Sequence, residues 1–531
     1  MARTHDALVV GAGFAGLYMV HKLRLEGFDV VGVEAGKGPG GTWYWNRYPG
    51  ARCDIPSIEY SYSFDPELEA EWRWSERYAA QPEILRYLEH VEERFELAPL
   101  FTYNTRVTEA TWDEAASRWN VTTDDGARWQ VQHLILATGA LSTPKLPDMP
   151  ALENFNGPVL HTAQWDESIE LEGRNVCLFG TGSSGIQAVS EIAKVAKQLT
   201  VFQRTPNFTV PAGNHPLSDE YLAEMRPQMK RLRDEARASA LGWFTGPQPG
   251  SAKDDDPETR QKRLQAAWDA GTTGLLTAYE DLLIDEESNA FAADFAREKI
   301  RELVHDKEKA RKLTPHGYPV GSRRTCTETG FYDAMNRDNV VLVDVREEPV
   351  EQVEANAIRT ASATYPADVL VFATGFDACV GAVKAIDITG RNGAKIAEEW
   401  ADGPRAYLGL GVSGFPNMFT VTGPGSPSVL SNVVLSIEQH VDWIARCLGD
   451  MRANGQQTIE AQPDAEQAWM EHTHEVAHQT LFPKADSWYQ GKTRDGKLVF
   501  MPYVGGCGAY REKCDDVAAK GYQGFKLGGI A

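Results

Sequence analysis

Residues 7–16, with the sequence ALVVGAGFAG, decide the fold of this chain. Four apolar residues of strand type lead into a Gly-x-Gly-x-x-Gly turn, and a helical pattern follows the turn. In such a turn Gly11 allows the tight bend, Gly13 lets a pyrophosphate approach the backbone, and Gly16 lets the helix pack closely. The stretch therefore predicts a strand, a turn and a helix that together bind a dinucleotide.

The acidic residue after the next strand indicates which dinucleotide this unit binds. The strand is predicted at residues 30–33 and ends at Glu34. A carboxylate at this position accepts hydrogen bonds from the hydroxyls of a ribose and repels a 2′-phosphate. The first unit is therefore suited to FAD or NAD rather than to NADP.

A second unit of the same kind is predicted further along the chain. Strand 175–179 leads into residues 180–185, with the sequence GTGSSG, and a helix and a strand at 199–203 follow. Arg204 then stands where the first unit has Glu34. A guanidinium pairs well with a 2′-phosphate, so this unit is suited to NADP. The alternative is that Arg204 is a solvated surface residue.

Composition and charge restrict the possible functions. The chain has 531 residues, 42% of them apolar and 24% charged, which is typical of a soluble globular protein with two or three domains. The net charge of −22 argues against binding to nucleic acid or to an anionic membrane surface. The sequence contains no uninterrupted apolar run of about 18 residues, so we expect no membrane-spanning segment.

The cysteines exclude one class of flavoenzyme. The seven cysteines are odd in number and include no Cys-x-x-Cys pair. This pattern is typical of a reduced, cytoplasmic protein without a disulfide framework and without a metal site. It also excludes the dithiol reductases, which need two redox cysteines beside the flavin.

The fold class predicted is α/β, with two Rossmann-like dinucleotide-binding domains, for FAD and NADP, and a helical insertion. The segments 137–139 and 373–375 both read Ala-Thr-Gly after a buried strand, which indicates that the two units are related. A β-meander is expected between 101 and 133, with strands at 119–123 and 129–132 and a separate strand at 133–137. We assign residues 1–150 plus 385–531 to the FAD domain, 151–215 plus 321–384 to the NADP domain, and 216–320 to the insertion.

The insertion is rich in Glu, Lys, Arg and Ala, and helices are expected at about 217–240 and 276–311. It could form a lid or a wall of a substrate cavity. It could equally be an addition without a role in the reaction.

Two dinucleotide sites with opposite charges at the ribose predict a flavoprotein that NADPH reduces. Because redox cysteines and metal-ligand clusters are missing, molecular oxygen is the simplest electron acceptor. An anionic oxygen adduct needs a permanent cation, which Arg provides better than Lys. Arg323 and Arg324 are candidates, although two adjacent arginines are more often an exposed basic turn.

Asp54 follows a glycine-rich aromatic loop that either lies against the flavin or only packs on the sheet.

At this point the sequence resembles a known family. Phe155-x-Gly157-x3-His161-x3-Trp165-Asp166 resembles the fingerprint of the type I Baeyer–Villiger monooxygenases. The stretch Gly41-x-Trp43-x4-Tyr48-Pro49-Gly50-x3-Asp54 resembles the longer second signature of that family. The related monooxygenases that act on nitrogen and sulfur usually have Tyr or Phe in place of Trp165. The resemblance extends over essentially the whole chain.

The resemblance implies roles for individual residues. Arg324 matches the arginine that stabilises the peroxyflavin anion, and Asp54 matches the carboxylate that positions it. Trp488 matches a loop tryptophan that folds over the nicotinamide cofactor. His161 and Trp165 are expected to shape the hinge between the domains. The substrate pocket is expected at Ser428, Val429 and Leu430.

The complete set of predicted cofactor-binding residues is Gly11, Gly13, Gly16, Glu34, Gly41, Thr42, Trp43, Arg52, Cys53, Asp54, Tyr60, Val107, Thr181, Gly182, Ser183, Ser184, Gly185, Ile186, Arg204, Thr205, Arg323, Val433 and Trp488.

The resemblance also implies a reaction. NADPH reduces FAD, and a peroxyflavin then inserts one oxygen atom next to a ketone carbonyl to give an ester or lactone. The expected partners are a small ketone and molecular oxygen, and the chain is expected to be a monomer or a weak oligomer. The alternatives are an N- or S-oxygenating flavin monooxygenase, an NADPH oxidase, and a flavoprotein that senses nucleotides without catalysis.

Overall fold

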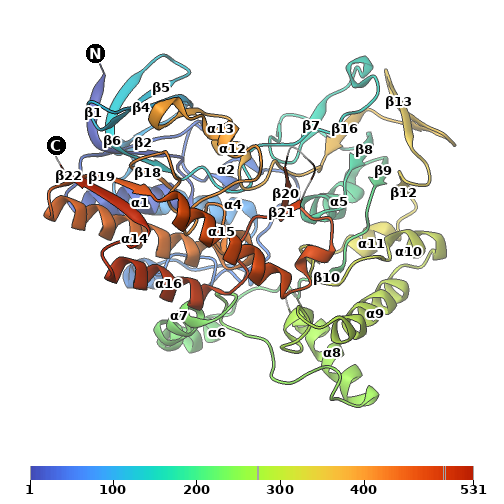
Figure 1. Cartoon of the computed structure of the whole chain (residues 1–531). Coiled ribbons are helices and arrows are strands. Elements are labelled where there is room, and N and C mark those ends of the chain that lie inside the picture. The colour runs from blue at the N-terminus through green and yellow to red at the C-terminus, as the bar shows by residue number, and fades with distance from the viewer. Residues whose placement is uncertain (1, 272–273, 494–495, 497, 530–531) are drawn as a thin grey trace.

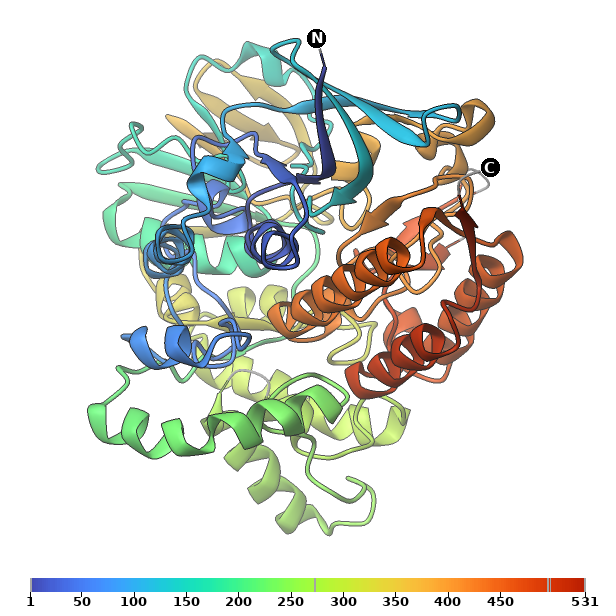
Figure 2. The ribbon, with the colours of Figure 1, turned by 90° about the vertical axis from the view of Figure 1, so that its left-hand side faces the viewer.

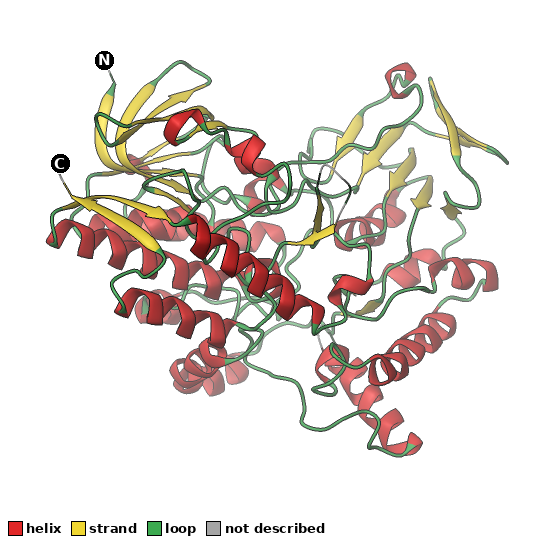
Figure 3. Ribbon diagram, in the orientation of Figure 1, coloured by secondary structure: helices red, strands yellow, loops and turns green. Residues whose placement is uncertain are grey.

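Two β-sheets lie at opposite upper sides of the molecule, and most helices lie below them (Figures 1 and 3). The computed structural model describes residues 2–271, 274–493, 496 and 498–529. The first sheet has the strand order β17-β4-β5-β6-β1-β2-β3, and β18 pairs with β6. Its strands are β1 (Arg3–Val10), β2 (Val30–Val33), β3 (Phe101–Thr102), β4 (Val107–Asp113), β5 (Arg118–Thr123), β6 (Arg128–Leu136), β17 (Asp387–Thr389) and β18 (Met418–Thr420).

Strand β1 is buried on both faces. Ala7 and Val9 pack toward the helices of the first unit, whereas Leu8 and Val10 pack into a second cluster on the other face of the sheet. Helix α1 (Phe14–Leu25) follows the glycine turn, and β1 pairs in parallel with β2 and β6. The predicted strand–turn–helix–strand unit is confirmed.

The β-meander differs from the prediction in one respect. Strands β5 and β6 are antiparallel, as expected, but 129–132 and 133–137 are parts of the single strand β6. The prediction of two strands was wrong because β1 pairs with β6 continuously, from Arg3 opposite Trp129 to Val10 opposite Leu136. One side of β6 completes the meander while the other side extends the parallel sheet.

The second sheet has the strand order β12-β9-β8-β16-β7, and all its pairs are parallel. Helix α5 (Ser183–Val195) follows β8 as α1 follows β1. The fingerprint stretch 155–166 is not only a connection, because its residues Val159–His161 form the edge strand β7. The strands are β7, β8 (Asn175–Phe179), β9 (Gln198–Gln203), β12 (Val340–Asp344) and β16 (Val369–Phe372).

The segment 216–320 is helical, as predicted, and forms the lower part of the molecule in Figure 2, but the helices predicted at about 217–240 and 276–311 are each divided, into α6 and α7 and into α9 and α10. One helix, α8, was not predicted, although Asp256 caps it and Pro257 opens it. The buried Arg233 of α7 donates hydrogen bonds to the carbonyl oxygens of Ile58 and Glu59 in the first unit. The helices are α6 (Asp219–Met225), α7 (Met229–Ala238), α8 (Pro257–Ala270), α9 (Glu286–Leu303) and α10 (Lys307–Leu313).

The long helix α14 (Val433–Ala453) packs along α1 under the first sheet. The other helices are α2 (Thr42–Trp45), α3 (Pro66–Glu71), α4 (Gln81–Arg94), α11 (Phe331–Met335), α12 (Gly381–Lys384), α13 (Ile396–Glu399), α15 (Pro463–His478) and α16 (Cys507–Ala519). The other strands are β10 (Thr209–Pro211), β11 (Cys326–Glu328), β13 (Val350–Glu354), β14 (Ala357–Thr360), β15 (Thr364–Pro366), β19 (Gln456–Ala461), β20 (Gln490–Lys492), β21 (Leu498–Phe500) and β22 (Phe525–Gly529).

We propose the domain boundaries given above, and sheet membership supports them. The chain enters the second sheet at β7 and leaves it after β16, and β17 then joins the first sheet. Among the described residues, no helix is both long and apolar enough to cross a membrane.

Candidate active site

A cavity of about 1610 Å³ lies where the carboxyl ends of the two sheets face each other. Its lining includes both glycine turns and both Ala-Thr-Gly segments, which follow β1, β8, β6 and β16. A cavity for one small ligand measures roughly 300–1,000 Å³. The larger volume and the two glycine turns fit a site for two dinucleotides.

The first glycine turn is closed by backbone contacts that exclude side chains. A Cβ atom on Gly16 would lie 1.8 Å from the carbonyl oxygen of Gly11, and one on Gly41 would lie 2.8 Å from Cα of Gly13. Helix α1 begins here without a side-chain cap. Its first N–H groups and the bare backbone around them fit the pyrophosphate of a dinucleotide.

Glu34 is buried beside this turn and is only 6% exposed. Its carboxylate accepts hydrogen bonds from the N–H of Ala12 at 2.8 Å and from the N–H of Gly36 at 2.6 Å. The side chain therefore fixes the turn, and because it also lines the cavity it can accept hydrogen bonds from a ribose.

The second turn repeats this construction. A Cβ atom on Gly185 would lie 2.1 Å from the carbonyl oxygen of Gly180. Arg204, Thr205 and Arg323 all line the cavity near this unit. They place two guanidinium groups and a hydroxyl at the cavity wall, and such a set could hold a phosphate.

The structure adds Arg346, which was not predicted. Its Nη2 donates a hydrogen bond to Oγ1 of Thr205 at 2.7 Å. A signal was available in the sequence, because Arg346 follows β12 as Arg204 follows β9, and these two strands are parallel neighbours. The carboxyl ends of parallel neighbours meet at one edge of the sheet, where Arg346 adds a third positive charge.

Arg324 and Asp54, which both line the cavity, form an ion pair. Nε of Arg324 donates to Oδ2 of Asp54 at 2.7 Å, and Nη2 donates to Oδ1 at 2.6 Å. Nη1 donates to the carbonyl oxygen of Val429 at 3.1 Å. Three hydrogen bonds thus fix the plane of the guanidinium, whose side chain remains 32% exposed and lines the cavity.

The surroundings of this ion pair keep the arginine charged. Burial disfavours the charge of Arg324, but the carboxylate of Asp54 outweighs this effect and raises the pKa of Arg324 further above its usual value. Tyr489, another residue that was not predicted, lies beside the same guanidinium. Burial raises the pKa of Tyr489 to about 12, although the charge of Arg324 opposes the rise. The site therefore holds a permanent cation next to a neutral phenol.

The loop that carries Asp54 joins the two units. The hydroxyl of Tyr48 donates to Oε1 of Gln187 in α5 at 2.7 Å. Gly50 has a φ of +84°, and a Cβ atom there would lie 2.6 Å from the carbonyl oxygen of Gln187. The loop thus packs directly on the helix of the second unit, which brings Asp54 to Arg324.

Most of the predicted site residues line this one cavity. Those that do are Gly11, Gly13, Glu34, Gly41, Thr42, Trp43, Arg52, Cys53, Asp54, Tyr60, Val107, Thr181, Gly182, Ser183, Ser184, Arg204, Thr205, Arg323, Arg324, Val429, Val433 and Trp488. Five others lie outside its lining: Gly16, Gly185, Ile186, Ser428 and Leu430. Gly16 and Gly185 act through close packing, and Ile186 is buried in the core of the second unit.

His161 does not line the cavity. Its ring is buried, Nδ1 accepts a hydrogen bond from the N–H of Ala163 at 3.0 Å, and the rings of His161 and Phe376 form a T-shaped pair. These contacts fit the expected role in shaping the connection between the domains.

Two dinucleotide-binding units that share one cavity, with a fixed arginine between them, define the class of two-nucleotide flavoprotein oxidoreductases. The family model for pyridine nucleotide-disulphide oxidoreductases matches residues 5–230. The cysteines of this chain are all unpaired, so the match reflects the nucleotide-binding fold rather than a redox disulfide.

Relatives along the whole chain identify the family. A phenazine N-monooxygenase from Lysobacter antibioticus is 40% identical over 99% of this chain and 97% of its own length. A Baeyer–Villiger monooxygenase from Pseudooceanicola batsensis is 38% identical over 97% of this chain and 95% of its own length. A solved steroid monooxygenase bound to NADP is 46% identical and superposes with a TM-score of 0.95 over 99% of this chain and 100% of the other. The chain belongs to the Baeyer–Villiger monooxygenase family.

Proposed function

We propose that this chain uses NADPH and molecular oxygen to insert one oxygen atom next to a ketone carbonyl, which gives an ester or a lactone. Its cofactors are FAD and NADP(H), and a related monooxygenase, OTEMO, has been solved in complex with both, with 36% identity, a TM-score of 0.95 and coverage of 99% of this chain and 100% of that one. The observation that carries the proposal is the ion pair of Arg324 and Asp54, both of which line the shared cavity.

Each nucleotide has a proposed site. FAD is assigned to the first glycine turn, with its ribose at Glu34, because a carboxylate disfavours a 2′-phosphate. NADPH is assigned to the second turn, with its 2′-phosphate between Arg204, Thr205 and Arg323. When bound, reduced FAD supplies the activation of oxygen.

The residues of the chain then supply charge and shape. Arg324 stays protonated and presents a fixed positive charge to the oxygen anion that develops at the ketone carbon, without a reorganisation cost at the moment of reaction. Asp54 holds the guanidinium in plane through two hydrogen bonds. Trp488 lines the cavity and is proposed to cover the nicotinamide.

A ketone as substrate is supported by the relatives. Curated relatives include a cyclohexanone 1,2-monooxygenase from Acinetobacter and an acetone monooxygenase from Gordonia, which are 36% and 38% identical to this chain. We propose that this chain likewise accepts a small ketone. The test is NADPH oxidation with a panel of linear, aryl and cyclic ketones in air, with the products identified by mass spectrometry. Ester or lactone formation is expected, and NADPH oxidation that yields only peroxide with every ketone would contradict the proposal.

N-oxygenation is a second candidate, because the phenazine N-monooxygenase is 40% identical over nearly the whole chain. Phenazine and a thioether are therefore included in the panel. An N-oxide without any ester would favour this second function. Trp165 argues for the first, since the related enzymes that oxidise nitrogen and sulfur usually have Tyr or Phe at this position.

A further inference from the structure

Lys145 lies on the connection between the two domains, and its backbone is held from both sides. Its N–H donates to the carbonyl oxygen of Gly375 at 2.9 Å, and its own carbonyl oxygen accepts from Oγ1 of Thr374 at 2.5 Å. The neighbouring Thr143 accepts from the N–H of Asp377 at 2.9 Å. These bonds fix the Cα atom of Lys145 at the cavity wall.

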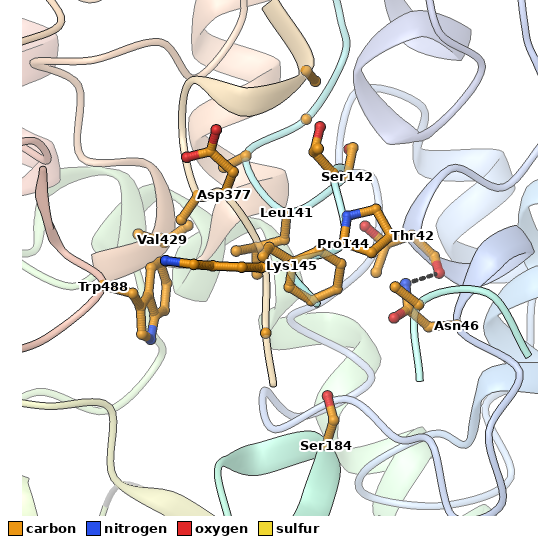
Figure 4. Close-up of a pocket in the computed structure, with 18 of the residues that line it drawn as sticks. Thr42, Asn46, Leu141, Ser142, Pro144, Lys145, Ser184, Asp377, Val429 and Trp488 are labelled. Atoms are coloured by element: carbon orange, nitrogen blue, oxygen red, sulfur yellow. Dashed lines mark hydrogen bonds between the residues drawn. The ribbon is translucent and has the colours of Figure 1, made fainter. Parts of the chain in front are cut away.

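The side chain of Lys145 points into the cavity. In Figure 4 it extends across the open space toward Trp488, and Val429 and Asp377 are drawn around the same part of the cavity. Val429 marks the reactive end, because its carbonyl oxygen accepts a hydrogen bond from Arg324. The ammonium group therefore points to the end of the cavity where the ketone must react.

The ammonium group forms no ion pair with any residue that the structure describes. Asp377 is the acid drawn nearest to it, but the carboxyl group of Asp377 packs on Gly381, where a Cβ atom would lie 3.0 Å from its Cγ. The protein as a whole carries a charge of −22, so an anion entering this cavity needs a local cation. Lys145 offers one on a long flexible stem.

The phosphates of NADP do not account for this charge. The second glycine turn, Arg204, Thr205 and Arg323 already supply groups for the pyrophosphate and the 2′-phosphate. Ser184, at the start of α5, is drawn well apart from the ammonium group in Figure 4. The position of Lys145 therefore fits an anionic group on the substrate better than a phosphate of the cofactor.

We propose that Lys145 determines substrate specificity by binding a carboxylate, and that the substrates this chain prefers are oxo carboxylic acids, in which a ketone and a carboxylate are joined by a carbon chain. The inference rests on the proposed function. The carboxylate pairs with the ammonium group while the ketone carbonyl lies at Arg324, so the length of the connecting chain selects the substrate. Lys145 is exposed, so one ion pair between its ammonium group and a carboxylate contributes up to about fivefold in affinity.

The test compares levulinic acid and longer straight-chain methyl-ketone acids, each beside its methyl ester, in the FAD-loaded enzyme. The ester keeps the ketone and nearly the same shape but has no charge. We measure kcat/KM for acid and ester, with product identification, in the wild type, Lys145→Met, Lys145→Arg and Lys145→Glu. The wild type should prefer at least one acid over its ester, and Lys145→Met should lower the acid-to-ester ratio about two- to fivefold. Lys145→Arg should largely restore the ratio, and Lys145→Glu should lower it below that of Lys145→Met.

Lys197→Met is the matched control, because Lys197 is exposed like Lys145 but does not line the cavity. It should leave the ratio unchanged. An acid-to-ester ratio that is the same in Lys145→Met and in the wild type would overturn the proposal. So would a rise in the KM for NADPH with an unchanged ratio, since Lys145 would then serve the cofactor. If the wild type converts esters and acids to no inserted product at all, the proposed function itself fails, which is a different result.

Discussion

Arg324 and Asp54 form a bidentate ion pair across the boundary between the two nucleotide-binding units, with N–O distances of 2.7 and 2.6 Å. Asp54 belongs to a loop of the first unit, and Arg324 follows the helical segment of the second. The two side chains meet only when the units are arranged as they are here. The pair thus couples the position of the cation to the relative placement of the two units.

Removing the guanidinium of Arg324 should leave reduction by NADPH intact and slow the oxygenation of the ketone. We expect Arg324→Ala to be reduced by NADPH at a rate near that of the wild type, since the proposed NADPH site lies elsewhere. Ester formation should fall by about 10² to 10³, the usual effect of removing one preorganised group that stabilises charge. Stopped-flow absorbance follows reduction, and gas chromatography follows the ester. Ester formation at a rate near that of the wild type would remove Arg324 from the mechanism.

Asp54→Asn tests whether the arginine must be held in place. The substitution keeps the size of the side chain but removes the charge and one acceptor, so the guanidinium loses its bidentate partner. Outer-shell groups that orient metal ligands contribute about 10- to 100-fold, and by analogy we expect ester formation to fall in this range. The FAD content, measured by absorbance, should be unchanged. A loss of FAD in parallel with activity would mean that Asp54 serves cofactor binding instead.

The residues that determine the fold could be recognised in the sequence because each pattern lies within a short stretch of the chain. Strands 30–33 and 175–179 were predicted with the bounds that the structure has, since short apolar runs next to glycine turns leave little choice. Helix α8 was missed because only Leu264 and Trp268 of it are buried, so its apolar pattern is weak. The prediction of two strands at 129–132 and 133–137 was wrong because the pairing of β6 with β1 is a long-range contact. The periodicity of apolar residues does not show such a contact.

The site residues divide in the same way: some are predicted by a local pattern in the sequence, and others are brought to the site only by a long-range contact. Arg204 was found from its position after a strand, whereas Arg346 reaches Thr205 only through the pairing of β9 with β12. The partnership of Arg324 with Asp54 came from the resemblance to a family. Spacing could not have given it, because neither residue lies near the other along the chain.

The preference for NADPH should depend on Arg204. Arg204→Ala should raise the KM for NADPH about 10- to 100-fold and change that for NADH little, because only NADPH carries the 2′-phosphate. Arg346→Ala should act in the same direction with a smaller effect, since Arg346 reaches Thr205 rather than lining the cavity. The measurement is steady-state kinetics with both nucleotides. An unchanged NADPH/NADH ratio in Arg204→Ala would show that the phosphate binds elsewhere.

Gly50→Ala should destabilise the contact between the two units. The residue has a φ of +84°, and the added Cβ atom would lie 2.6 Å from the carbonyl oxygen of Gln187, so both the backbone and the packing are strained. We expect the free energy of unfolding to fall by about 1–3 kcal/mol in urea titrations. Gly38→Ala is the control, because a Cβ atom on Gly38 meets nothing within 4 Å. Equal stability of the two variants would contradict the packing described here.

Glu59 should give the stability of the fold a pH dependence. It is 6% exposed and accepts a hydrogen bond from the N–H of Phe244 at 2.8 Å, and burial raises its pKa from 4.5 to about 7. Between these values the folded state binds a proton that the unfolded chain has released, so the free energy of unfolding falls as the pH rises from 4.5 to about 7 and then levels off. Glu59→Gln keeps an acceptor for Phe244 and does not titrate. The stability of the wild type relative to this variant should therefore decrease by up to about 3 kcal/mol between about pH 5 and about pH 8 in urea titrations. A difference between the two proteins that is constant with pH would show that Glu59 is already ionised in the folded state at about pH 5.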